Sequence, residues 1–231
     1  GYSPIDFNRQ PLPIIITEKP PNRSLEDLLN VKRSKEKVDE WNDTKKLIEI
    51  FGIASGMAYL HSHNVIHRNL TPESIFLDDY LFPKIGNFGL LRKIHSVASM
   101  TFQTTIGIKE NFSYSSPELL ENNEYSKQSD VYSFALVVYE IMTLNVPFKD
   151  QKNFNNLYNE VVLNSKRPKL DDRIPERYRQ LIEICWSQSP EDRPTFEKIM
   201  SILKNDDGFI TKDVDKKAFK EYVKMIEESQ I

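Results

Sequence analysis

The stretch HRNLTPESIFLDD, residues 67–79, decides how the rest of the chain is interpreted. An apolar, helix-patterned segment precedes it, and its second half contains the short apolar run Ile75-Phe76-Leu77. A second short apolar piece, FPKIG, follows the turn DDYL, so the two pieces predict a small β-hairpin. Residues 67–74 therefore form a polar loop between a helix and a hairpin.

Length and composition limit the class of protein. The 231 residues suffice for one large domain, or for one domain with a small partner domain. Hydrophobic residues make up 39% of the chain, which allows a substantial core. The net charge of -3 gives no electrostatic reason to expect a nucleic acid or an anionic membrane as a partner. The most apolar stretch, FALVVY at residues 134–139, is too short to cross a membrane.

The single cysteine, Cys185, lies in the apolar helical stretch LIEICW. We expect a buried structural thiol rather than a nucleophile, because no activating cation or histidine is close in the sequence. One cysteine allows no internal disulfide, so a reducing compartment fits. We expect the cytoplasm, with the nucleus as the alternative.

Two helices are predicted ahead of the loop, separated by a charged segment. Ser24 is the expected N-cap of a short helix, with Asp27 at its third position. Both signs of charge alternate in residues 31–40, which predicts a solvated loop rather than a binding patch.

The second of these helices is predicted to be amphipathic. Asp43 or Thr44 is its expected cap. Gly52 and Gly56 weaken the helix locally and permit close packing. Its predicted buried stripe consists of Leu47, Ile50, Phe51, Ala54, Met57, Ala58 and His61.

Helices also dominate the second half of the chain. The polar segment 95–116 has no clear period and is interpreted as a long mobile loop. From Ser126 the pattern predicts a helix that is buried on almost all sides. Amphipathic helices are expected at 154–163, 175–186 and 194–203, followed by a charged tail helix that packs back on the body.

The order of the motifs carries a resemblance to a known family. HRNLTPES is similar to the catalytic-loop motif H-R-D-L-K-P-E-N, KIGNFG to the strand that leads into D-F-G, and SYSSPELL to the A-P-E segment. YSKQSDVYSF is similar to a helix that carries a structural Asp, and CWSQSPEDRPTF to a segment that supplies an Arg. Together they resemble the C-terminal lobe of a protein kinase, most closely one of the tyrosine-kinase-like group. Five motifs in this order are far more specific than any one of them.

The resemblance, which covers about residues 1–204, implies a fold. We expect an α+β architecture, namely a mostly α-helical kinase-like large lobe with a small β-hairpin, preceded by the last strands of a truncated small lobe. Residues 1–18 are then the remnant of the small lobe, 19–204 the C-terminal lobe and 205–231 a tail helix. Whether the rest of the small lobe is absent from the protein or only from this chain stays open.

The resemblance also implies residues with architectural roles. His67 and Phe88 correspond to side chains that link the two lobes, and Asp130 to the group that holds the catalytic-loop backbone. Glu118 and Arg193 are expected to form a buried ion pair. Arg68 and Gly89 complete this structural set.

The positions that carry the chemistry in the family hold other residues here. Asn69 replaces the catalytic Asp, and an amide is not a base near neutral pH. Thr71 replaces the Lys that contacts the γ-phosphate. Ser74 and Asn87 replace the Asn and Asp that hold the metal, and neutral oxygens are poor substitutes for a carboxylate on Mg²⁺. No competent catalytic residue is therefore predicted.

The nucleotide site is interpreted as vestigial. If Thr17 is the gatekeeper, Glu18 follows it and Pro20 takes the position whose N–H normally binds adenine, which proline lacks. Phe76 is the remaining residue assigned to this site. No two glycines have G-x-G spacing and no lysine precedes Lys19. Neither ATP nor Mg²⁺ is predicted as a cofactor, although both are cofactors of the family.

The leading interpretation is a pseudokinase that acts as a binding or scaffolding module in signalling, with a protein partner of unknown identity and neither nucleic acid nor membrane. An active or weakly active ATP-dependent serine/threonine kinase is the alternative if an upstream small lobe exists, because Pro72 and Glu73 match that class. A degenerate fragment without selected function is a second alternative.

Two weaker signals concern metal binding and phosphorylation. His61 and His63 form an H-S-H pair, but without a third ligand nearby a structural role is favoured. Phosphorylation of hydroxyl residues in the 95–116 loop, with Arg68 as the partner of the phosphate, is left open. An unmodified flexible loop is somewhat favoured.

Overall fold

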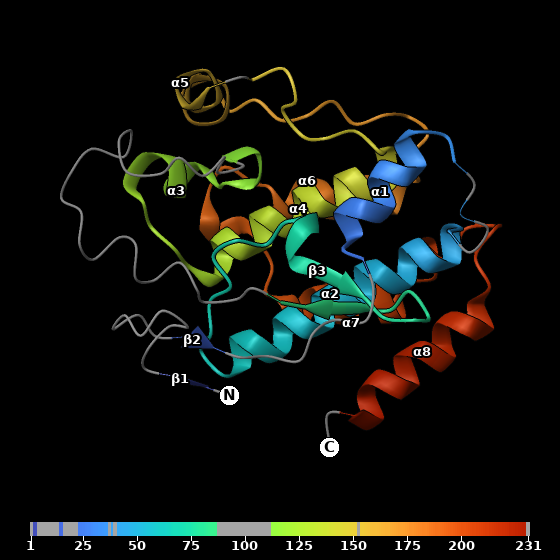
Figure 1. Cartoon of the computed structure of the whole chain (residues 1–231). Coiled ribbons are helices and arrows are strands. Elements are labelled where there is room, and N and C mark those ends of the chain that lie inside the picture. Colours follow the sequence, from blue (N-terminus) through green and yellow to red (C-terminus); the bar gives the residue numbers. More distant parts are fainter. Residues whose placement is uncertain are drawn as a thin grey trace.

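The computed structural model describes the backbone of residues 2–3 and 14–15, and residues 23–36, 38, 41–86, 112–151 and 153–229 in full. These parts are mostly helical, with two small antiparallel strand pairs, so the expected α+β class is confirmed (Figure 1). The helices are α1 (Leu25–Arg33), α2 (Asp43–Ser62), α3 (Pro117–Asn122), α4 (Lys127–Thr143), α5 (Phe154–Tyr158), α6 (Glu176–Cys185), α7 (Phe196–Asn205) and α8 (Lys216–Ser229). The shorter turns are η1 (Pro72–Ser74), η3 (Phe112–Tyr114), the π-helical η4 (Asn159–Leu163), η5 (Pro190–Asp192) and η6 (Asp207–Phe209).

Both strand pairs are short. β1 (Tyr2–Ser3) pairs with β2 (Ile14–Ile15), and β3 (Ile75–Leu77) pairs with β4 (Pro83–Ile85). The hairpin predicted around DDYL is therefore confirmed. Oδ1 of Asp78 accepts hydrogen bonds from the N–H groups of Tyr80 at 3.0 Å and Phe82 at 2.9 Å, which closes the turn between β3 and β4.

The first full helix, α1, begins as the sequence predicts and ends later. Ser24 and Asp27 form a reciprocal capping box at its start. The helix continues through Arg33, so the expectation of a solvated loop over all of 31–40 is wrong at its beginning. Arg33 bonds the carbonyl of Leu144 at 2.8 Å, and this tertiary contact stabilises a helical turn that charge alternation alone does not indicate.

Helix α2 runs through the centre of the body and packs against α4, α7, α8 and β4. Its cap is Asn42, one residue before the expected Asp43, because the Asn42 side chain accepts from the N–H of Lys45 at 3.0 Å. The predicted stripe is buried, and both glycines are sites of close packing. The opposite side, including Ile48, Glu49 and Ile53, is also buried, which a single-stripe pattern does not predict.

The second half supplies the rest of the core. Helix α4, capped by Ser126, is buried on nearly all sides, as expected, and packs against α6. The helix expected at 154–163 divides into α5 and η4. The end of the segment interpreted as a mobile loop is ordered, because residues 112–114 form η3 and the buried Ser116 is the N-cap residue of α3. Cys185 is fully buried, and burial raises the pKa of its thiol, as a structural role requires.

The tail helix α8 lies at the edge of the body beside α2 (Figure 1). Phe219 meets Phe51 of α2 edge-on with ring centroids 5.6 Å apart, and Tyr222 lies 4.6 Å from Phe82 beside the hairpin. The expectation that the tail packs back on the body is confirmed.

Candidate functional site

The loop at residues 67–74 is held by Asp130 of α4. Oδ2 of Asp130 accepts from the backbone N–H of His67 at 2.8 Å, and Oδ1 accepts from that of Arg68 at 2.9 Å. Nε2 of His61 lies 2.9 Å from the same Oδ2. Asp130 is 1% exposed, so these donors replace the water that a buried carboxylate needs. They also hold Arg68 at a φ of 73°, a left-handed conformation uncommon for a residue other than glycine.

His67 ties the loop to the residue that follows β4. Its Nδ1 accepts from the backbone N–H of Asn69 at 3.3 Å, and its Nε2 donates to the carbonyl of Gly86 at 3.0 Å. Because one ring nitrogen accepts and the other donates, the imidazole is neutral. Burial lowers the pKa of His67, which agrees with the neutral form. The ring therefore positions the loop against the hairpin.

The hydroxyl of Ser74 is engaged inside the loop. It accepts from the backbone N–H of Thr71 at 3.0 Å and donates to the carbonyl of the same residue at 2.8 Å. The backbone N–H of Ser74 donates to that carbonyl as well, at 3.0 Å, which closes the turn η1. Ser74 is 1% exposed and Thr71 is 5% exposed. The hydroxyl therefore closes a turn and is withdrawn from any ligand above the loop.

The other expected site positions divide into described and undescribed ones. Asn69 is exposed, with its side chain at the surface of the loop. Phe76 is half-buried in β3, and a Cβ atom at Gly86 would lie 2.6 Å from Cε2 of its ring, so this close approach requires glycine. The expected positions that lie outside the described residues are Thr17, Glu18, Pro20, Asn87, Phe88, Gly89 and the loop segment 95–111.

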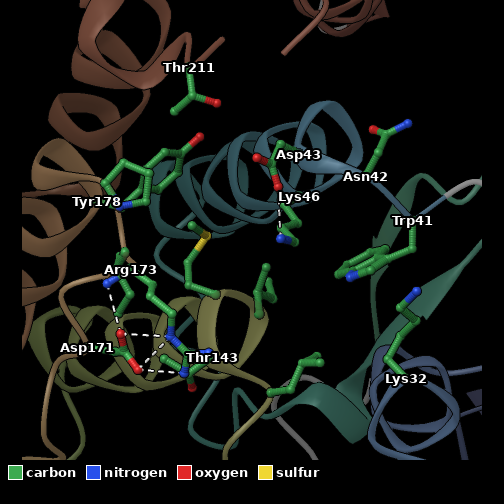
Figure 2. A pocket seen from close by; sticks show the side chains of 15 residues that line it. Lys32, Trp41, Asn42, Asp43, Lys46, Thr143, Asp171, Arg173, Tyr178 and Thr211 are labelled. Carbon is green, nitrogen blue, oxygen red and sulfur yellow. Dashed lines mark hydrogen bonds and ion pairs between the residues drawn. The ribbon is translucent and has the colours of Figure 1, made fainter. Parts of the chain in front are cut away.

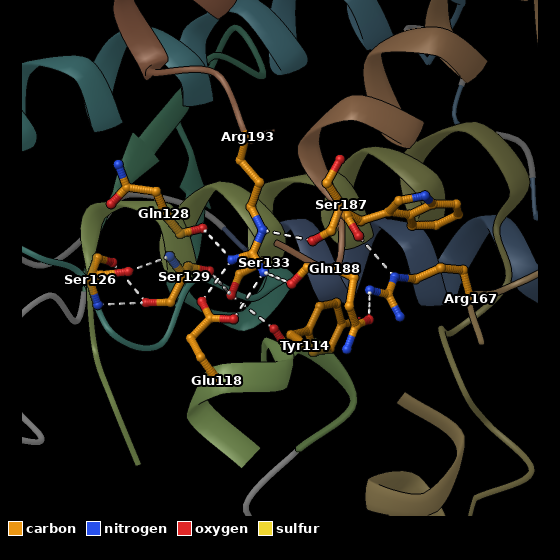
Figure 3. A network of polar contacts seen from close by, with 11 residues as sticks. Tyr114, Glu118, Ser126, Gln128, Ser129, Ser133, Arg167, Ser187, Gln188 and Arg193 are labelled. Carbon is orange, nitrogen blue, oxygen red and sulfur yellow. Dashed lines mark hydrogen bonds and ion pairs between the residues drawn. The ribbon is translucent and has the colours of Figure 1, made fainter. Parts of the chain in front are cut away.

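Arg193 and Glu118 form the ion pair that joins α3 to the segment before α7 (Figure 3). The guanidinium donates to both carboxylate oxygens, Nη1 to Oε1 at 2.7 Å and Nη2 to Oε2 at 2.9 Å. Its remaining donors bond the carbonyls of Ser187, Gln128 and Gln188. A two-pronged pair with every guanidinium nitrogen bonded is the arrangement in which a buried charge is fully compensated.

Tyr132 of α4 forms the floor of this network. Two guanidinium groups lie near its ring, with the Cζ atoms of Arg193 and Arg167 each 5.1 Å from the centroid. Burial raises the pKa of Tyr132 to about 12, so the phenol stays neutral beside the two cations.

A second buried network was not anticipated from the sequence. The carboxylate of Glu140 on α4 contacts the guanidinium of Arg33 on α1 and the hydroxyl of Tyr114 on η3. Burial raises the pKa of Glu140 to about 7 against the opposing effects of Tyr114 and Arg33. The signal that could have found it is a lone acidic residue, Glu140, in the otherwise apolar run FALVVYEIM. The network thereby joins α1, η3 and α4.

Comparisons with known proteins agree with this architecture. The family described as protein tyrosine and serine/threonine kinase matches residues 5–203, which is most of the chain. The chain belongs to the protein kinase family. It is 38% identical over 155 residues to a probable serine/threonine-protein kinase of Dictyostelium discoideum, a match that covers 66% of this chain and 16% of the relative.

Other kinases are similar over longer stretches. A dual specificity protein kinase of Dictyostelium discoideum is 33% identical over 191 residues, covering 83% of this chain and 13% of the relative. A serine/threonine-protein kinase of Arabidopsis thaliana is 29% identical over 196 residues, covering 84% of this chain and 32% of the relative. The chain thus spans less than a third of the length of each of these kinases.

Two further observations bear on ligands and membranes. In the described residues of this kinase-family chain, no group of three or more His, Cys, Asp or Glu side chains is arranged to hold a metal. Nε2 of His61, one member of the H-S-H pair, is hydrogen-bonded to Asp130. Nδ1 of His63, the other member, lies 2.9 Å from the carbonyl of Tyr59. None of the described helices combines the length and apolarity that crossing a bilayer requires.

Proposed function

We propose that this chain is a catalytically inactive kinase domain, a pseudokinase, that binds another protein and acts as a scaffolding module in signalling, in the cytoplasm or the nucleus. Residues 19–204 form the kinase-like lobe of this proposal, 1–18 the remnant of a small lobe and 205–231 an added tail helix. The resemblance to the tyrosine-kinase-like group belongs to the same proposal.

The position of the Ser74 hydroxyl carries this proposal. In a working kinase the residue at this place offers an oxygen to Mg²⁺ beside the phosphates. The Ser74 hydroxyl instead donates one hydrogen bond to the backbone of Thr71 and accepts another from it. The hydroxyl is also buried, away from solvent. The described residues of the loop therefore do not fit a Mg²⁺ ion, and no step of phosphoryl transfer is derived through one.

The contrast with the scaffold residues supports the same conclusion. Asp130, His67 and the Arg193–Glu118 pair have their hydrogen bonds satisfied, while Asn69 offers a neutral amide where a general base is needed. General-base help is typically worth about 10²–10⁴-fold in rate. A lobe that retains these structural hydrogen bonds but lacks the proton acceptor is better suited to binding a partner than to catalysing phosphoryl transfer.

A weakly active serine/threonine kinase is the second candidate. It is favoured by the names of the relatives and by Pro72 and Glu73, which resemble the serine/threonine form of the loop and lie in η1. This candidate needs a small lobe supplied by a longer protein and a different proton acceptor.

A thermal-shift titration with ATP, with and without Mg²⁺ or Mn²⁺, tests the proposal. A ligand that binds only the folded state at 100 times its Kd stabilises that state by about 2.7 kcal/mol, so binding must raise the transition temperature. We expect one cooperative transition and no metal-dependent shift. A non-cooperative transition would favour a fragment without selected function.

A phosphotransfer assay with the purified chain completes the test. We expect no transfer from the wild type. The variant Asn69→Asp serves as the matched control, because it restores the proton acceptor at an exposed position without disturbing the buried frame. Transfer by the wild type that needs Mg²⁺ and disappears when the ATP is withheld would overturn the proposal.

A further inference from the structure

Helix α2 carries a carboxyl group that the rest of the described chain leaves without a partner. Glu49 is fully buried, and neither of its carboxylate oxygens has a hydrogen-bond partner among the described residues. Both oxygens are also closed to solvent. Such a group is costly to ionise, because nothing replaces the water that a charge requires. A movement that admits water to Glu49 is therefore favoured when the group loses its proton.

Glu49 belongs to the side of α2 that faces the β3–β4 hairpin and the tail helix α8. Lys45 precedes it by four residues and Gly52 follows it by three, so the three positions lie on one side of the helix. The ammonium of Lys45 donates to a backbone carbonyl in the hairpin turn. A Cβ atom at Gly52 would lie 2.5 Å from Cγ of Pro83 in β4, and it would collide with the hydroxyl of Tyr222 in α8. Both the hairpin and α8 therefore cover the side of α2 to which Glu49 belongs.

Among the described residues, three titratable side chains interact with the charge of Glu49, one from each of these elements. Desolvation is the largest effect and raises the pKa of Glu49 well above its usual value. Lys45 of α2 opposes this rise, and Asp78 in the hairpin turn, whose Oδ2 lies 3.9 Å from Nζ of Lys84, adds to it. In α8, burial and then the charge of Glu49 raise the pKa of Tyr222. Helices α4 and α7 also pack against α2, and within the described ranges none of their charges shifts the pKa of Glu49.

The hairpin and α8 are held on α2 in different ways. Backbone hydrogen bonds fix the hairpin, because β3 pairs with β4 and the N–H of Leu77 donates to the carbonyl of Arg23 at 3.1 Å. Helix α8 contacts α2 through side chains, with the rings of Phe219 and Tyr222 against that of Phe51. Of the two covering elements, α8 is therefore the one that can move without breaking the backbone hydrogen bonds of a sheet.

The connection from η6 to α8 is anchored at the start of α2. The backbone N–H of Asp215 donates to Oγ1 of Thr44 at 2.8 Å. Thr211 of the same connection lines a cavity together with Asn42 and Asp43, two residues at the start of α2 (Figure 2). Because this anchor precedes the first residue of α8, the helix can leave α2 while its connection stays attached.

We propose that α8 is a pH-sensitive strap, which is seated on α2 while Glu49 is protonated and is released as Glu49 ionises. Release admits water to the carboxylate and uncovers the aromatic surface that α2 and the hairpin present to α8. The strap is independent of phosphoryl transfer and of its proposed loss, because α8 lies outside residues 5–203, the part of the chain that matches the kinase family.

The direction of the pH dependence follows from the pKa of Glu49 in the seated state. This pKa is raised above the usual value of about 4.5, which an exposed Glu49 regains on release. Seating is therefore strongest below about pH 4.5 and weakens as the pH rises toward the seated-state value. Between the two values, the equilibrium constant for release should increase about tenfold per pH unit, because one proton is lost.

Amide hydrogen exchange of the 231-residue chain from pH 5 to pH 9, measured by mass spectrometry for peptides of α8 and α6, tests the strap. After correction for the intrinsic exchange rate at each pH, the opening constant of α8 should rise about tenfold per pH unit up to the seated-state pKa. Amides of α8 should also exchange faster than those of α6, because α8 opens while the lobe stays folded. Equal protection of the two helices, or an opening constant of α8 that does not rise with pH, would overturn the proposal.

Substitutions separate Glu49 from the other acidic groups. Glu49→Gln keeps the shape of the side chain and cannot ionise, so the corrected exchange of α8 should lose its rise with pH. Glu221→Gln removes a carboxylate that is 68% exposed on α8 itself, and it should keep the wild-type pH dependence. Glu140, whose pKa is raised to about 7, titrates in both variants and cancels between them.

A second substitution covers the case in which Glu49→Gln fails to fold. Glu49→Met places an apolar side chain of similar length at the same position, and the expected result is the same loss of pH dependence. A rise of α8 exchange with pH that survives in the Glu49 variant, or that disappears in Glu221→Gln, would contradict the role of Glu49.

Discussion

Two buried charged sites of this chain are built in opposite ways. Arg193 is 4% exposed and bonds both oxygens of Glu118 and three backbone carbonyls. Glu49 of α2 is fully buried between the body and α8, and neither of its carboxylate oxygens has a hydrogen-bond partner among the described residues. Desolvation raises the pKa of Glu49 well above its usual value.

The difference follows the boundary of the family architecture. Arg193 and Glu118 both lie within residues 5–203, which the kinase family matches, and their partners lie there too. The tail helix α8 lies beyond that match and packs against α2, where Tyr222 meets the ring of Phe51 and where burial, together with the charge of Glu49, raises the pKa of Tyr222. In the family core a buried charge is stabilised by partners, whereas the unpartnered carboxyl of Glu49 has a pKa that desolvation raises, which favours its neutral form.

The largest effect is expected from Arg193→Met, which breaks the partnered site. It leaves Glu118 without its counter-ion and three carbonyls without donors, so the free energy of unfolding should fall by about 3–5 kcal/mol. Urea denaturation followed by circular dichroism measures the loss. The double variant Arg193→Met, Glu118→Gln should lose less than the single variant, because no uncompensated charge remains. A single-variant loss below about 1 kcal/mol would place this pair among ordinary surface pairs.

Gly52→Ala should disturb the other site through packing. A Cβ atom at Gly52 would collide with the hydroxyl of Tyr222 and lie 2.5 Å from Cγ of Pro83. Overpacking of this kind typically costs about 1–3 kcal/mol, and here it falls on the interface between α2 and α8. Limited proteolysis should therefore cut within α8 faster than in the wild type. Adding Tyr222→Phe should recover part of the protection, since Pro83 still crowds the site.

Glu49→Leu should stabilise the chain, because it removes a buried polar group that has no partner. The gain at neutral pH is expected to be about 0.5–2 kcal/mol. The folded-state pKa of Glu49 is raised, so its contribution is fully present below about pH 4.5, the usual pKa, and is lost as pH rises toward the folded-state value. The advantage of the Leu variant should therefore grow with rising pH.

The control for this prediction is Glu49→Gln, which keeps a polar side chain of the same shape and cannot titrate. Unfolding free energies of wild type and Gln variant, measured from pH 4 to pH 9, should diverge as pH increases. Glu140, whose pKa is raised to about 7, titrates in both proteins and cancels in the difference. Parallel pH profiles would mean that Glu49 gains solvent or a partner when it ionises.

The limits of the family match are also the limits of what the sequence could predict. Motif order located the Asp130 and Arg193 positions, because each lies in a stretch that resembles a kinase motif. Local chemistry predicted the cap at Ser24, and the hydrophobic pattern predicted a helix from Ser126, which the structure shows to be its cap. Periodicity could not predict that the second side of α2 is covered, because the covering helix α8 is more than 150 residues away in the sequence.

Two contacts of the site were also beyond sequence reasoning. The engagement of Ser74 with the backbone of Thr71 depends on a turn geometry that residue types alone do not specify. The contact of Arg33 with Glu140 joins residues 107 positions apart, and alternating charges around Arg33 suggested solvent instead. Such long-range polar pairs leave only a weak trace in one sequence, namely an isolated acid inside an apolar run.

The smallest effect is expected at an exposed pair between the body and the tail helix. Lys204 of α7 contacts Glu227 of α8, and both side chains are more than 40% exposed. Exposed pairs of this kind are typically worth about 0.2–1 kcal/mol and are screened by salt. Lys204→Met should therefore shift the urea midpoint slightly at low ionic strength and hardly at all in 1 M NaCl. A large loss at both ionic strengths would mean that the tail helix is held by charge, whereas the aromatic contacts of Phe219 and Tyr222 indicate that apolar packing holds it.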